Sequence, residues 1–248
     1  MDTTKSLEQA FLHSRLGMSI LAIIFPFVFI FLSGIGVYDW RYAISAYYHL
    51  DGFARNFFVA VMFTVGFMLI RYEGILSPTT IPFKVAGMGA IAAAFFPTDN
   101  NGCTVDVVWM GSGGIHLAGG VIFFGAMIYA CHKLSKEAVE KYQGHSRGAE
   151  LKKMYTRCKA LMATLMVAPI AYGLGGIILP DLKNLMCDWN AILWFETIGV
   201  VGFGYFWLVR TRDIDETVSI EILGSQIEVV KRTVSSFFGD SAKKQSDQ

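Results

Sequence analysis

Long apolar runs alternate with short polar connections along the chain. A helix rises 1.5 Å per residue, so about 20 apolar residues cross a bilayer core of about 30 Å. Six runs fit this pattern, at residues 16–37, 53–70, 82–97, 107–131, 160–179 and 189–209. The pattern predicts an all-α fold, a polytopic transmembrane helix bundle of about six spans, over residues 1–212.

Composition supports a membrane location over a water-soluble core. Hydrophobic residues make up 54% of the 248 residues and charged residues 17%, with a mean hydropathy of +0.46, whereas soluble domains carry about 25% charged residues. The net charge is +1 without a block of like charge, so no nucleic-acid partner is predicted. The first run is too long for the apolar part of a secretory signal and lacks a small-residue cleavage site after it, so we interpret it as a retained span.

The basic residues of the short loops predict the orientation. The connection between the fourth and fifth runs is rich in lysine and arginine, and Arg210 and Arg212 follow the sixth run. The opposite connections carry mostly acidic residues, namely Asp39, Asp51, Asp99, Asp106, Asp181 and Asp188. Because basic loops are retained in the cytoplasm during insertion, both termini are expected to be cytoplasmic.

The four cysteines divide between the two sides of this topology. Cys103 and Cys187 fall in outer connections, where disulfides persist, whereas Cys131 and Cys158 fall at cytoplasmic ends, where thiols stay reduced. The topology allows a disulfide between Cys103 and Cys187. It equally allows four unpaired cysteines, because the sequence does not show that the two loops meet.

Glycines crowd the last three predicted spans, and residues 213–248 form a separate cytoplasmic region. Small residues let helices approach closely in lipid, so we expect the glycine faces to be helix contacts. Apolar residues of the tail recur every three or four positions, at Ile220, Leu223, Ile227, Val230, Val234 and Phe237. This spacing predicts an amphipathic helix that contacts a homo-oligomer or a membrane-complex partner, or packs under the bundle. Residues 239–248 are expected to be disordered.

Two ionisable side chains stand out because they lie deep inside predicted spans, at His116 and Glu196. Their positions place both about 10 to 14 Å below the outer ends of their helices. Ionisable groups at such depth are costly and usually face the bundle interior or a water-filled cavity, which makes them candidate functional residues. The structural alternatives are an imidazole bonded to a neighbouring carbonyl and a protonated acid that ties two helices together.

The first outer connection, residues 39–51, is dense in polar side chains. If it is helical, Ser45 and His49 share one face at a spacing of four residues. The candidate ligand-binding residues are Ser45, Tyr48, Arg55 and Asn56. An interfacial aromatic belt is the alternative role of its aromatic residues.

A metal site is one hypothesis for the outer polar residues. Pro97 ends the third span, so Asp99 is expected at the outer side. The candidate metal ligands are His49, Asp99 and His116, and the candidate catalytic residues are Asp99, His116 and Glu196. Zinc suits these ligand types, and a carboxylate could serve as general base for an activated water. No recognised metal spacing is present, and a buried Arg55 paired with Glu196 or Asp99 would instead make a structural network.

Two family resemblances rest on these residues. Ser45-Ala-Tyr-Tyr-His49, Arg55-Asn-Phe-Phe-Val59, Phe96-Pro-Thr98, His116 and Glu196 resemble a group of uncharacterised bacterial multi-span membrane proteins, which implies a bacterial inner membrane. Ser45-x-x-x-His49 with Asp99 is similar to part of the zinc site of the alkaline ceramidase and adiponectin-receptor-like superfamily. That superfamily has seven spans and a late H-x-x-x-H pair, which this chain lacks.

Three functions follow from these features. The second resemblance implies a lipid-directed hydrolase that acts on an amide or ester at the outer face. The same polar residues would also suit a sensor or transporter that binds a small molecule or a proton. A structural or accessory subunit of a membrane complex is the third. The sequence leaves open whether the protein is an enzyme and whether it binds a metal.

Overall fold

The computed structural model describes residues 3–50, 52–72, 80–98, 112–143, 145–178 and 180–212, with the side chains of residues 3–9, 11, 168–178, 180, 182 and 183 left aside. All regular elements in these ranges are helices, as predicted. They are α1 (Thr3–Gly34), the 3-10 helix η1 (Ser45–His49), α2 (Phe53–Arg71), α3 (Thr80–Phe95), α4 (Ser112–Lys141), α5 (Ser146–Ile178), α6 (Pro180–Asp188) and α7 (Ala191–Arg212). The predicted tail helix lies outside the described residues.

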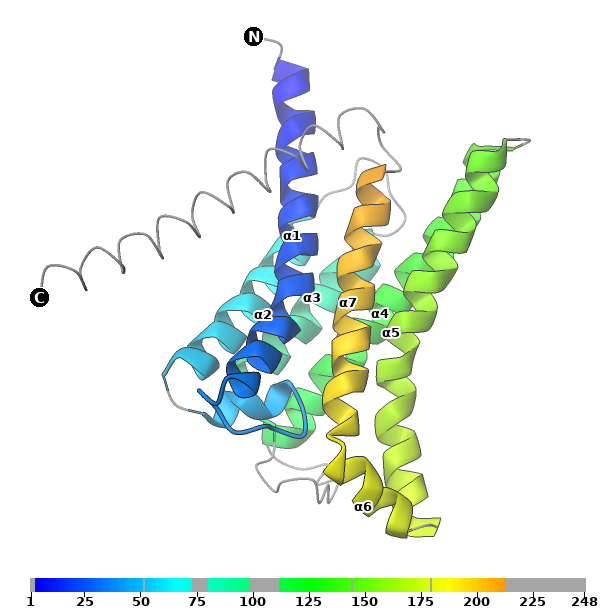
Figure 1. The fold of residues 1–248 in the computed structure, drawn as a ribbon. Coiled ribbons are helices and arrows are strands. Elements are labelled where there is room, and N and C mark those ends of the chain that lie inside the picture. Colours follow the sequence, from blue (N-terminus) through cyan, green and yellow to red (C-terminus); the bar gives the residue numbers. More distant parts are fainter. Residues whose placement is uncertain are drawn as a thin grey trace, which may run out of the picture.

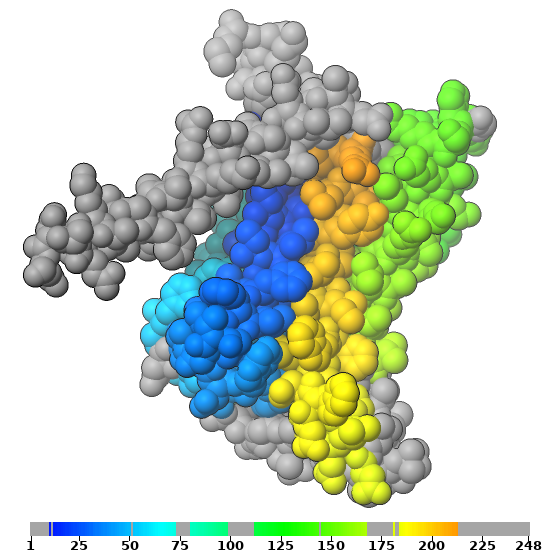
Figure 2. Space-filling model, viewed as in Figure 1, coloured from blue at the N-terminus to red at the C-terminus, as the bar shows by residue number. Residues whose placement is uncertain are grey.

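The long helices form a ring in chain order. Each of α1 to α5 packs against the next, α5 packs against α7, and α7 returns to α1. Figure 1 shows the start of α1, the end of α7 and the α4–α5 connection at one end of the bundle, which we call the terminal end. The connection that holds η1 and the short helix α6 lie at the opposite end, the η1 end. Figure 2 shows α1, α7 and α5 side by side as one continuous face.

Among the described residues, four helices are long and apolar enough to cross a membrane, at Leu12–Gly34, Phe53–Arg71, Ser112–Lys141 and Ala191–Arg212. They correspond to the first, second, fourth and sixth predicted spans and support a membrane protein. The third predicted span is α3, a shorter apolar helix of 16 residues. The fifth lies within α5, where the side chains after residue 167 are not described.

Helix α4 is longer than the apolar run that predicted it. The run ends at residue 131, whereas the helix continues to Lys141. Residues 132–141 contain no proline or glycine and are mostly good helix formers, so nothing in the sequence ends the helix at the membrane surface. The apolar run therefore predicted the position of the span but not the residue at which the helix ends.

Aromatic side chains fill the middle of the ring. Phe203 of α7 lies 5.1 Å from Phe123 of α4, measured between ring centroids. Trp207 of the same helix lies 5.6 Å from Phe83 of α3, and all four rings are buried. Tilted and edge-to-face pairs of this kind contribute about 0.5–1.5 kcal/mol each beyond area burial. Helix α7 therefore contacts helices across the ring as well as its two neighbours.

Glycines allow neighbouring helices to touch backbone to backbone. A Cβ atom added to Gly66 of α2 would lie 2.7 Å from the carbonyl oxygen of Gly87 of α3, and one added to Gly119 of α4 would lie 2.7 Å from that of Gly89 of α3. Such distances exclude any side chain. The predicted contact role is confirmed for Gly119, Gly199, Gly202 and Gly204.

Two other glycines of α4 do not make helix contacts. A Cβ atom added to Gly120 or Gly125 would meet no atom within 4 Å. The expectation of a helix contact is therefore wrong for these two positions. They lie on open faces of α4, so a larger side chain fits there without displacing a neighbour.

Candidate functional site

The Glu196 carboxylate binds the start of η1. Its Oε2 accepts hydrogen bonds from the backbone N–H groups of Ile44, at 2.6 Å, and Ser45, at 3.3 Å, and its Oε1 accepts one from the Ser45 hydroxyl at 3.3 Å. The first N–H groups of a helix have no partner within it and carry partial positive charge. A carboxylate accepts hydrogen bonds from these N–H groups and also carries the opposite charge. Glu196 thereby ties the connection between α1 and α2 to α7.

A tyrosine fixes the middle of η1 to α1. The Tyr47 side chain is fully buried, and its ring stacks on Phe29 with 4.6 Å between centroids. Its hydroxyl shares a 2.6 Å hydrogen bond with the Ser33 hydroxyl of α1. A buried phenol needs such a partner, because an unbonded hydroxyl in this setting costs about 1–3 kcal/mol. The sequence offered an aromatic belt as the alternative role of this tyrosine and did not predict its contact with Ser33.

Arg55 binds the other end of η1. Its Nε donates a 2.9 Å hydrogen bond to the carbonyl oxygen of Tyr48, and its guanidinium lies 5.6 Å from the centre of the Tyr48 ring. Arg55 thus contacts the carbonyl end of η1, whereas Glu196 contacts the N–H end. Asn56, the other predicted ligand-binding residue of α2, is exposed on the first turn of that helix.

Two histidines bind carbonyl groups at the end of α3. His49 Nε2 lies 2.7 Å from the Thr98 carbonyl oxygen. His116 Nδ1 lies 3.0 Å from the carbonyl oxygen of Ala93 and 2.8 Å from that of Phe96. A carbonyl oxygen only accepts, so these ring nitrogens carry the proton and donate. The carbonyl-bonded imidazole, which the sequence offered as the structural alternative for His116, is the arrangement found.

Pro97 explains why the Ala93 carbonyl needs His116. In an α-helix the carbonyl of residue i accepts from the N–H of residue i+4, and Phe96 N–H still donates to Ala92 at 3.0 Å. The next donor in the series would be Pro97, which has no N–H. The Ala93 carbonyl therefore takes its hydrogen bond from His116. The proline was visible in the sequence, and it was a signal for an orphan carbonyl at Ala93.

Ser45 and His49 do not share a face, contrary to the sequence-based expectation. The segment is a 3-10 helix, with 3.0 residues per turn, so positions four apart point in different directions. Ser45 binds Glu196 of α7, and His49 binds Thr98 after α3. The polar residues are thus spread over both sides of η1 rather than gathered on one.

The described residues do not fit a zinc site. A catalytic zinc site needs three protein ligands, and within residues 3–98 and 112–212, apart from the gaps given above, no group of three or more histidines, cysteines, aspartates or glutamates could hold a metal ion. Glu196 and the two histidines instead bind separate backbone segments. Asp99, a predicted ligand and catalytic residue, lies outside the described residues.

The described cysteines differ in their bonding. Cys131 and Cys158 are free and buried. Cys187 of α6, at the η1 end of the bundle, is disulfide-bonded. Its predicted partner, Cys103, lies outside the described residues, so the pairing stays a prediction.

We expect His116→Ala to destabilise the protein by about 1–3 kcal/mol, the cost of leaving a buried carbonyl without a partner. The loss should be smaller when Pro97→Ala is already present, because residue 97 can then donate its own N–H to Ala93. Thermal melts of the four proteins in detergent, followed with a dye that reacts with Cys131 and Cys158 on unfolding, measure this coupling. Equal losses in both backgrounds would contradict the role assigned to His116.

Comparison of the chain with protein-family models, with curated proteins and with solved structures finds no match. The resemblances that its short motifs suggest remain expectations. The function is therefore inferred from the contacts of Glu196, His49, His116 and Arg55 with the backbone.

Proposed function

We propose that this chain is a structural or accessory subunit of a membrane complex, in which the polar residues at the η1 end stabilise the fold. The observation that carries the proposal is that Glu196, His49 and His116 all bind backbone groups of the chain itself. Such contacts satisfy buried backbone and hold the η1 connection against the bundle. A reacting centre would need the same side-chain atoms to face a substrate.

The basic residues support a topology with both termini in the cytoplasm, consistent with a bacterial inner membrane. In the described part of the chain the largest group of basic residues lies around the α4–α5 connection and the end of α7, at Lys133, Lys136, Lys141, Arg147, Lys152, Lys153, Arg157, Arg210 and Arg212, whereas Arg41, Arg55 and Lys183 lie at the η1 end. The largest group belongs to the terminal end of the bundle (Figure 1). The positive-inside rule assigns that end to the cytoplasm.

Side chains from two neighbouring helices hold the end of α7, where the tail begins. Arg147 of α5 donates a 3.0 Å hydrogen bond to the carbonyl oxygen of Arg212, and Arg15 of α1 donates one of 3.4 Å to that of Arg210. These bonds hold the last described turn of α7 against α1 and α5. The apolar positions between Ile220 and Phe237 would then present one helical stripe to a partner subunit or to a second copy of the chain.

Deleting the tail after Arg212 should abolish recovery of the partner subunit while leaving the bundle folded. The physical reason is that the contacts around α7 and η1 lie within residues 1–212, whereas the proposed partner stripe lies beyond them. Crosslinking in native membranes followed by affinity purification compares the truncated and full chains, and a thermal melt checks the fold. Unchanged crosslinked partners after truncation would contradict the tail's part in the proposal.

Metal content distinguishes this role from the zinc-dependent lipid hydrolysis that the resemblance implies. We expect purified protein to contain far less than one zinc per chain by elemental analysis, and the content to be the same in His49→Ala, Asp99→Ala and His116→Ala. One zinc per chain, lost in the His116 or Asp99 variant, would contradict the structural role and favour the enzyme.

A further inference from the structure

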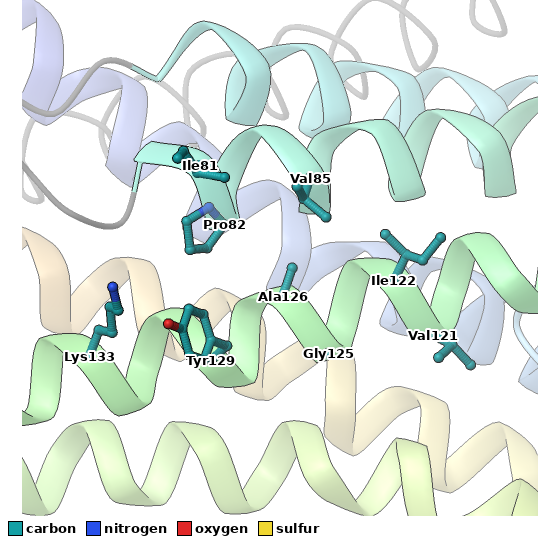
Figure 3. Close-up of a pocket in the computed structure, with 9 residues that line it drawn as sticks. All are labelled: Ile81, Pro82, Val85, Val121, Ile122, Gly125, Ala126, Tyr129 and Lys133. Carbon is teal, nitrogen blue, oxygen red and sulfur yellow. The ribbon is translucent and has the colours of Figure 1, made fainter.

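A groove runs between α3 and α4 on the outside of the ring, with a volume of about 480 Å³. Ile81, Pro82 and Val85 of α3 form one wall, and α4 forms the other wall and the floor (Figure 3). The α4 residues are Val121, Ile122, Gly125, Ala126, Tyr129 and Lys133. Gly125 and Ala126 have small side chains or none, which leaves space for the groove over this part of α4. No atom lies within 4 Å of a Cβ added to Gly125.

The walls of the groove are apolar and face outward. Ile81 is 73% exposed, and Val121 and Ile122 are each 46% exposed. Helix α4 is apolar and long enough to cross a membrane. In a bilayer these exposed side chains would therefore meet lipid tails or another apolar helix.

One end of the groove carries a positive charge. Lys133 is the single charged residue among the nine that line it, and its Nζ lies 5.4 Å from the centre of the Tyr129 ring. Figure 3 shows the Lys133 side chain directed from α4 toward the α3 wall, with the Tyr129 ring lying along α4 and its hydroxyl toward the Lys133 end. Lysine and tyrosine at the end of an apolar span are typical of the headgroup level of a membrane. The groove therefore combines an apolar body with a cationic end.

The length of the groove matches one leaflet. Val121 and Lys133 are about 18 Å apart along the axis of α4, and half of a hydrocarbon core of about 30 Å is about 15 Å. An acyl chain that extends from headgroup level toward the bilayer centre would run the length of the groove. The cation at headgroup level fits the phosphate of a lipid, which lies at that same level.

We propose that this groove, defined by the nine residues above, binds one acyl chain of an anionic glycerophospholipid from the leaflet at the terminal end, with the lipid phosphate paired to Lys133. Apolar contact with the walls holds the chain, and the ammonium selects the headgroup. The site is separate from the polar residues at the η1 end. It does not depend on the accessory role proposed above.

Two substitutions and two matched controls test the site. Gly125→Leu fills the groove without displacing a neighbour, and Gly120→Leu adds the same side chain to the same helix at a position that also meets no atom within 4 Å but does not line the groove. Lys133→Gln removes the cation, and Lys136→Gln removes an exposed cation outside the groove. Thermal melts establish that each variant is folded.

Native mass spectrometry of the full chain, with phosphatidylglycerol and phosphatidylcholine of identical acyl chains, measures binding. We expect the wild type to retain phosphatidylglycerol about fivefold better than phosphatidylcholine, the order of one partly exposed ion pair. Lys133→Gln should remove that preference, Gly125→Leu should lower retention of both lipids, and the two control variants should behave as the wild type. Equal retention of the two lipids by the wild type, or unchanged retention in Gly125→Leu, would overturn the proposal. A Gly125→Leu variant that changes the dimer fraction instead of lipid retention would assign the groove to a second copy of the chain and also overturn it.

Discussion

The hydrogen bonds between the Glu196 carboxylate and the start of η1 are the contacts on which the η1 end of the bundle depends. The connection between α1 and α2 is not a continuous α-helix, so its backbone groups need partners from elsewhere in the fold. Next to a hydrocarbon layer, an unsatisfied backbone group costs several kcal/mol. Glu196 supplies acceptors for the Ile44 and Ser45 amides from a helix on another part of the ring. The buried acid is thereby explained as part of the backbone hydrogen bonding.

The end of α3 meets the same requirement with histidines. Pro97 leaves the Ala93 carbonyl without its usual donor, and the imidazole of His116 replaces it from the neighbouring helix α4. His49 donates a hydrogen bond from η1 to the carbonyl of Thr98, just after α3. The polar side chains Glu196, His49 and His116 thus bond to backbone groups at helix ends and in the η1 connection. In doing so they join η1, α3, α4 and α7.

Local sequence patterns predicted the elements better than the contacts between them. Apolar runs located the helices, and isolated ionisable residues within those runs singled out His116 and Glu196. Their roles depended on partners far along the chain, since Glu196 and Ser45 are separated by 151 positions, and a single sequence contains no signal for such pairing. Spacing arguments were wrong where the helix type differed, as at Ser45 and His49. The expectation that glycines mark helix contacts was wrong where a glycine lies on an open face, as at Gly125. Pro97 shows what closer reading could have added, because a missing N–H identifies the carbonyl that needs a donor.

Hydrogen exchange of the η1 amides, in the full chain in detergent, tests the role of Glu196 most directly. The account predicts slow exchange at Ile44 and Ser45 in the wild type and exchange at least about tenfold faster in Glu196→Ala, because loss of the acceptor opens these amides. Ser45→Ala, which removes only the hydroxyl bond, should stay close to the wild type, and amides in the middle of α4 should be unaffected in both variants. Equal exchange rates at Ile44 and Ser45 in the wild type and Glu196→Ala would contradict the account.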